Sequence, residues 1–174
     1  KSGGPLKKYL DFEAAAKRAP KENRGGKITK FHGRSWIPLL EGAAAEGWDE
    51  IGASHTFHEI QMYYPMRVVR DRDYKLIWNI AHPLPFPFAS DLWVAPTWQA
   101  QFKQGPSTSY GQRSVSEYIQ RPEFELFDMR EDPNESTNLA GDPAHYETLE
   151  RYKAKLKAMQ KRTSDPWAMK WSYE

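Results

Sequence analysis

The chain has 174 residues, a formal net charge of +2 and no cysteine. The lack of cysteine excludes disulfide scaffolds, Cys-ligated zinc, iron–sulfur clusters and thiol nucleophiles. The length corresponds to one domain or slightly more, and 7 Trp, 9 Tyr and 8 Phe argue against disorder. The balanced charge, without basic and aromatic residues interleaved on one element, disfavours a nucleic-acid binder.

The sequence shows neither a membrane anchor nor a signal peptide. No apolar run approaches the 18 or more residues that a membrane span needs, and residues 1–5 contain no apolar stretch. We therefore expect no membrane contact. Because the chain does not start with Met, we expect the sequence to begin partway into a longer gene product.

The first fifty residues predict mostly short elements. Residues 6–18 predict a short helix that ends before Pro20, and 21–30 form a basic loop. Residues 32–42 place apolar side chains between two glycines and a proline, which predicts a buried turn that leads into a short helical element. A small-residue linker follows at 43–51.

The middle of the chain predicts strands and then an irregular loop. Residues 54–69 and 74–80 are rich in β-branched and aromatic residues, and the polar turn 71–73 between them predicts a hairpin. Residues 81–106 contain several prolines, so we expect an ordered loop without helix or central strand. Its aromatic side chains could bind a carbohydrate, but packing against the core is the favoured interpretation.

The last third predicts a strand and the clearest helix. Residues 124–128 alternate as a strand does, and a helix over 143–162 starts at the N-cap Asp142. After Asp165 and Pro166 end it, we expect Trp167 and Trp171 to fold back on the body. The predicted fold class is α+β, with a small antiparallel sheet packed by a C-terminal helix.

One polar cluster, residues 54–59, contains candidates for chemistry. His55 and His58 could share a metal on a helix, but on a strand residues three apart face opposite ways, and the zinc motif HExxH is absent. A histidine with the adjacent Glu59 could supply acid–base catalysis or hydrogen bonds to a substrate. A purely structural strand end is the favoured alternative. Neither a G-x-S-x-G elbow nor a phosphate-binding glycine loop occurs.

Three stretches together resemble the C-terminal part of a sulfatase, in the alkaline-phosphatase-like superfamily. They are HGRSWIPLL at 32–40, SHTFHE at 54–59 running through YPMRVVR at 64–70 to YKLI at 74–77, and ELFD at 125–128 followed by DPNESTNLA at 132–140. The third is general to sulfatases. The second, with the Pro-Phe-Pro run at 85–87, is most similar to the heparan N-sulfatase branch.

The resemblance implies a division of the chain and a missing catalytic centre. Residues 1–50 would end the large sulfatase domain, and 51–174 would form the C-terminal subdomain. The family's formylglycine nucleophile arises from Cys or Ser in C/S-x-P-x-R, and the nearest candidate, Ser164, has Ala168 in place of the arginine. We therefore expect no catalytic residue and no metal ligand in this segment, with formylglycine and calcium in the upstream domain. The segment alone should be inactive.

The resemblance also implies a role and a partner. The segment would pack on the upstream catalytic domain and shape a pocket for sulfated amino sugars. His55, His58, Glu59 and Arg67 are the predicted substrate-binding residues, although Arg67 could equally form a structural ion pair. The bond cleaved, S–N or S–O, stays open, as does a homodimer. We expect a periplasmic or secreted bacterial protein, or a lysosomal one in a eukaryote.

A second hypothesis is a stand-alone module that binds sulfated or other acidic glycans. It would use the basic loop at 21–30 and the aromatic loop at 83–98. Salt-sensitive binding of heparin by the isolated chain would support it.

Overall fold

The computed structural model describes residues 33–44, 46–58 and 62–173. The chain divides into two compact units, one up to Trp48 and one from Asp49 onward. The predicted helix at 6–18 and the basic loop at 21–30 lie outside the described residues. The assignment of these units to two sulfatase domains stays a prediction.

The described part of the first unit holds one short helix, α3 (Ile37–Leu40). Pro38 suits the first turn of a helix, where its missing N–H costs nothing. The prediction that this stretch is buried is wrong for most of it. Ile37 is buried, but the exposed fractions of Trp36 and Leu40 are 61% and 74%. A four-residue helix points side chains to all sides, so a single neighbouring surface covers only one of them.

The second unit is built on a four-stranded antiparallel sheet. Its strands are β1 (Ile51–His58), β2 (Met62–Arg70), β3 (Tyr74–Asn79) and β6 (Phe124–Asp128), in the order β1-β2-β3-β6. The predicted single strand at 54–69 is thus two strands. The predicted hairpin lies between β2 and β3, where Asp71 Oδ1 accepts hydrogen bonds from the Asp73 and Tyr74 N–H groups. The predicted strand 124–128 is confirmed.

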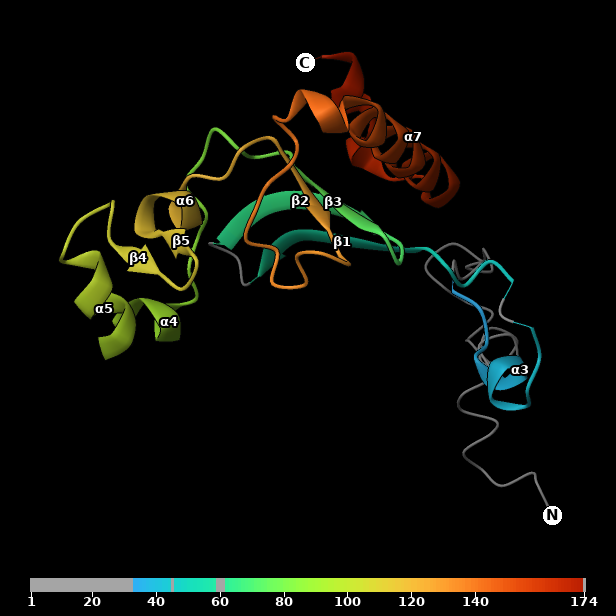
Figure 1. The fold of residues 1–174 in the computed structure, drawn as a ribbon, viewed down its shortest axis with the longest axis horizontal. Coiled ribbons are helices and arrows are strands. Elements are labelled where there is room, and N and C mark those ends of the chain that lie inside the picture. The colour runs from blue at the N-terminus through green and yellow to red at the C-terminus, as the bar shows by residue number, and fades with distance from the viewer. Residues whose placement is uncertain (1–32, 45, 59–61, 174) are drawn as a thin grey trace, which may run out of the picture. The chain divides into compact units, whose positions relative to one another are not determined.

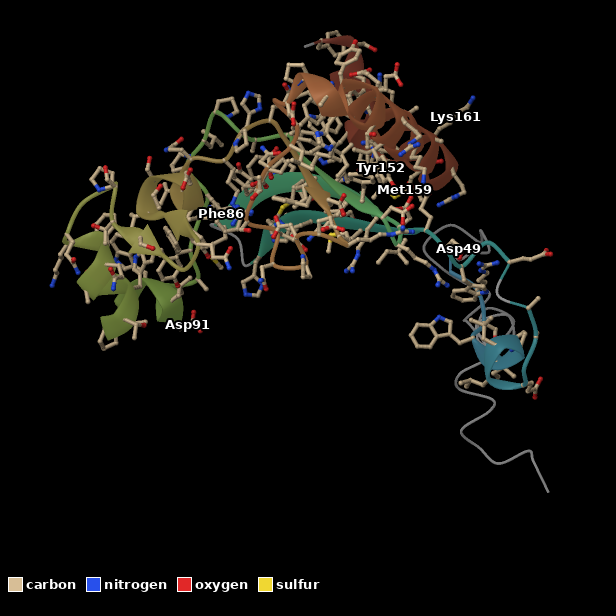
Figure 2. All side chains as sticks on the ribbon, in the orientation of Figure 1. Asp49, Phe86, Asp91, Tyr152, Met159 and Lys161 are labelled. Carbon is tan, nitrogen blue, oxygen red and sulfur yellow. The ribbon has the colours of Figure 1, made fainter. Side chains whose placement is uncertain are left out.

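Helix α7 (Tyr146–Thr163) covers one face of the sheet, as Figure 1 shows. The short 3-10 turn η1 (Pro143–His145) leads into it, and Asp142 caps that turn by accepting from the Ala144 N–H, as predicted. In Figure 2 Tyr152 and Met159 lie between α7 and the sheet, whereas Lys161 points away from it. The core between helix and sheet consists of Val69, Leu76, Trp78, Ile80, Leu126, Leu149, Tyr152, Leu156 and Met159.

The chain then turns back in a second 3-10 segment, η2 (Pro166–Ser172). Trp167 and Trp171 pack against the core, which confirms the prediction that they fold back. The Trp171 ring stacks on Trp78 with 4.0 Å between the ring centroids. Among the residues with described structure, no helix is long and apolar enough to cross a membrane.

Residues 81–120 form an aromatic lobe at one end of the sheet, and the part over 81–106 is not the helix-free loop that was predicted. The lobe contains α4 (Ser90–Val94), α5 (Pro96–Phe102), the small hairpin β4 (Ser109–Tyr110) and β5 (Arg113–Ser114), and α6 (Val115–Ile119). The prolines permit these helices because Pro96 opens α5, where its fixed φ is favourable. Ser114 and Glu117 add a capping box to α6.

The aromatic side chains of this lobe pack as favoured from the sequence, but mainly on one another rather than against the core of the sheet. Trp98 is fully buried. Its ring lies within 6 Å, centroid to centroid, of four others: Phe88, Phe102, Tyr110 and Tyr118. Such clusters stabilise small helices that could not form alone in water. The lobe is therefore a second small core attached to the end of the sheet.

Candidate functional site

A hollow of about 180 Å³ lies where the end of β1 meets the aromatic lobe. Phe86, labelled in Figure 2, marks this junction. The lining is mostly apolar and includes both predicted histidines: His55, His58, Met62, Phe86, Pro87, Phe88, Ala89, Leu92 and Tyr118. Pockets for drug-sized ligands are larger, at about 300–1,000 Å³. The hollow is therefore suited to a single small ring rather than to an oligosaccharide.

The structure brings His55 and His58 to the same hollow, whereas a regular strand would have placed them on opposite faces. The pairing of β1 with β2 shifts register between His55 and Phe57. One residue of β1, Thr56, there faces two residues of β2, one of which is a proline that has no N–H to donate. Such a bulge bends and twists the strands locally, so the simple alternation rule fails at this point.

The hydrogen bond of His55 fixes its tautomer. The Nδ1 atom of His55 lies 3.0 Å from the backbone oxygen of Tyr64. A carbonyl oxygen can only accept, so Nδ1 carries the proton and donates. In the neutral form of such a ring, Nε2 is the acceptor. His55 is thus set to receive a hydrogen bond from a hydroxyl or an ammonium group.

The aromatic wall of the hollow is held from behind by Arg121. The guanidinium carbon of Arg121 lies 3.6 Å from the Phe86 ring centroid and 5.5 Å from that of Tyr118. Phe86 also packs edge-on against Tyr64 and donates its backbone N–H to the Ile119 carbonyl. Burial lowers the pKa of Arg121, which nevertheless remains charged at neutral pH. These contacts hold the wall in place from the side away from the hollow's histidines.

Arg67, another predicted substrate-binding residue, forms the structural ion pair that was its alternative. Its Nε and Nη2 atoms donate to the Asp165 carboxylate at 2.5 and 2.9 Å, and Nη1 donates to the backbone oxygens of His55 and Met66. Only 4% of Arg67 is exposed. Any added domain could only bury it further, so Arg67 acts here by holding the backbone of His55.

Glu59, the remaining predicted site residue, lies outside the described residues. A calcium or formylglycine centre finds no fit in the part of the chain that the structure describes. No group of three or more His, Asp or Glu side chains there could hold a metal ion. The chain has no cysteine, and Ser164, the nearest serine candidate for formylglycine, has Ala168 in place of the required arginine.

The sequence predicted the two histidines of the hollow, and Phe86 to Leu92 belong to the aromatic loop at 83–98 that was considered as a carbohydrate surface. The Pro-Phe-Pro run at 85–87 was noted for its resemblance, and it supplies Phe86 and Pro87. Met62 and Tyr118 had no distinguishing pattern, because each is a single residue on a different element, β2 and α6. Only the register shift and the fold of the lobe bring them together.

Comparisons with known proteins connect this chain to sulfatases. A human protein, N-sulphoglucosamine sulphohydrolase, is 36% identical to the chain over 148 residues, which cover 82% of the chain. These residues span only 28% of the length of that relative. A solved structure described as a 2-O GAG sulfatase matches 80% of the chain, with a TM-score of 0.51 and 20% identity, over 23% of its own length. That match shows the fold alone. No family model matches the chain.

Proposed function

Because this chain belongs to the sulfatase family, we propose that it supplies one wall of the substrate pocket in a larger sulfatase that acts on sulfated amino sugars. The substrate class is supported by the human relative, whose name specifies N-sulphoglucosamine. The part of the protein outside this chain would provide the nucleophile and the calcium. This segment would be the C-terminal subdomain, inactive alone.

The observation that carries the proposal is the hollow with two histidines and an aromatic wall. A sugar ring offers hydroxyls, which hydrogen-bond, and C–H faces, which pack on aromatic rings. His55 Nε2 is left as an acceptor by its bond to Tyr64. Phe86 and Tyr118 supply ring surface beside it. Polar groups placed in an apolar pocket typically fix the orientation of a small ligand.

This chain's own contribution to the reaction would be binding and orientation. Sulfuryl transfer needs fixed positive charges around the transferring group and a precisely placed substrate. His55 and His58 would hold the sugar, with Glu59 beside them as a predicted contact to a hydroxyl or amine. Arg67 would hold the His55 backbone rather than touch the substrate. An exported location, periplasmic, secreted or lysosomal, goes with this proposal.

Sulfate release from N-sulfated glucosamine by the whole protein tests the proposal. His55→Ala or His58→Ala should each remove one hydrogen bond to the substrate. Such a bond contributes roughly 1.4 kcal/mol, which corresponds to a factor of ten, so kcat/KM should fall about tenfold. His145→Ala, a histidine that pairs with Asp142 far along the chain, is the matched control. If both site variants retain the kcat/KM of the control, these histidines do not bind the substrate.

The stand-alone glycan-binding module is the second outcome that the experiment separates. The whole protein would then release no sulfate from any sulfated amino sugar, while the chain would bind heparin in a salt-sensitive way. The structure favours this alternative less, because Phe88 and Trp98 pack on each other inside the lobe. The basic loop at 21–30 lies outside the described residues.

A further inference from the structure

The two outer strands of the sheet, β1 and β6, differ in how their outer edges are covered. Edge strands expose N–H and C=O groups that can pair with another strand, and proteins usually protect them. The β6 edge is protected by residues 138–139. Asn138 accepts from the Leu126 N–H and donates to the Phe124 oxygen, and Leu139 donates its N–H to the Leu126 oxygen.

The opposite edge, β1, has no such protection among the residues that the structure describes. β2 is its only neighbour in the sheet. β1 is eight residues long and contains neither proline nor any Lys, Arg, Asp or Glu, residues that commonly block an edge. The register shift between His55 and Phe57, another such device, interrupts only its last part. Its two large apolar side chains, Ile51 and Phe57, are 60% and 64% exposed. This edge thus has the properties of a strand that another strand covers.

We propose that the free edge of β1 pairs with an extended segment of the larger sulfatase outside this chain, which places that segment next to the His55/His58 hollow. The inference rests on the proposed function for the identity of the partner. The inference goes further than the proposed function because it assigns the surface through which this chain and the rest of the protein meet.

The chemistry of the hollow favours this partner over a second copy of the chain. His55 and His58 both belong to β1, so whatever pairs along this strand lies beside the hollow. A sulfatase pocket needs a nucleophile and a metal, and the described residues offer no metal-binding group. A second copy would add the same residues again. The rest of the protein is the larger share, since this chain spans 28% of its human relative.

Hydrogen exchange of the β1 amides in the whole protein tests the proposal directly. In an edge strand alternate N–H groups bond to the one neighbour and the others face outward. If β1 is covered, both sets exchange slowly. If every second amide between Ile51 and His58 exchanges at the rate of an open edge, the proposal is wrong. Because this measurement does not use activity, it can succeed even if the whole protein releases no sulfate.

A charge on the edge gives a second, independent test. Phe57→Lys should lower the Tm of the whole protein and accelerate β1 exchange, because a lysine opposes pairing at an edge. Tyr146→Lys is the matched control, since Tyr146 is an aromatic residue of similar exposure, 63%, at the start of α7. Equal Tm values for the two variants would overturn the proposal.

The same variants show whether the β1 edge instead pairs with a second copy of the chain. Sedimentation of the whole protein should give the same oligomeric state for Phe57→Lys and for the wild type. A dimer that Phe57→Lys dissociates, and Tyr146→Lys does not, would instead assign the β1 edge to an interface between copies.

Discussion

The guanidinium of Arg67 and the carboxylate of Asp165 form a two-bonded ion pair between the sheet and the segment that follows α7. The Nε–Oδ2 and Nη2–Oδ1 distances are 2.5 and 2.9 Å, and the two side chains are only 5% and 8% exposed. Asp165 also accepts from the Gln160 side chain and the Trp167 N–H. The pair therefore joins β2, the end of α7 and η2, and it supports the backbone of His55.

Replacement of Arg67 should destabilise the chain strongly. In Arg67→Met the Asp165 carboxylate stays buried without its cation, and such a loss costs about 3–5 kcal/mol. The free energy of unfolding in urea measures this loss. Arg72→Met is the control, because Arg72 is exposed and pairs loosely with Asp49 at 3.6 Å. Its effect should stay within about 0.5 kcal/mol. Equal effects of the two substitutions would show that the buried pair contributes no more than a surface one.

Stability should fall in acid because of Asp165 and Asp71. Burial by itself would raise the pKa of each carboxyl, but hydrogen bonds from Arg67 and Gln160 to Asp165 and from Lys155 and Tyr152 to Asp71 outweigh it. Both pKa values are therefore lower in the folded state than the usual value of about 3.9. Their stabilisation is complete above that value and is lost as the pH falls through the folded pKa.

The unfolding free energy measured from pH 6 to pH 2.5 checks this direction. Asp165→Asn should be less stable at pH 6 and should show a shallower decline in acid, since one of the linked groups is gone. A variant whose decline is as steep as that of the wild type would show that Asp165 does not titrate with a lowered pKa.

Arg121 should matter for the shape of the hollow more than for its charge. Arg121→Lys keeps the positive charge but loses the planar guanidinium that stacks on Phe86. We expect a loss of stability of about 1 kcal/mol and, in the whole protein, a higher KM with little change in kcat. Arg130→Lys, on the exposed turn after β6, is the control. A kcat that falls while KM is unchanged would argue against a positioning role.

Gly52 should accept a side chain only if Met159 of α7 moves aside. A Cβ atom at Gly52 would lie 1.8 Å from the Met159 sulfur, so Gly52→Ala should cost about 1–3 kcal/mol through overpacking. The double variant Gly52→Ala/Met159→Ala should show strong coupling, since the smaller side chain removes the clash. Gly141→Ala, with open space around its Cβ position, should be close to neutral. Additive effects in the double variant would exclude this clash.

The sequence by itself determined the elements whose pattern is local. The strand 124–128 and the helix after Asp142 were predictable because alternation, the N-cap and a three-to-four residue spacing all lie within one segment. The sulfatase resemblance could also be recognised from the sequence, since it depends on short motifs. The two helices at 90–102 were not predicted, because prolines that forbid a helix interior are favourable at a helix start.

Only the tertiary structure decided where the predicted site residues lie and what they contact. Arg67 and Asp165 are 98 positions apart, and no local pattern tells an arginine that binds a ligand from one that is paired. His55 and His58 share a hollow because the register shifts between two strands, and a register shift is a property of the pairing rather than of either strand. The hollow itself exists because the aromatic lobe folds against the end of the sheet, which is a long-range contact.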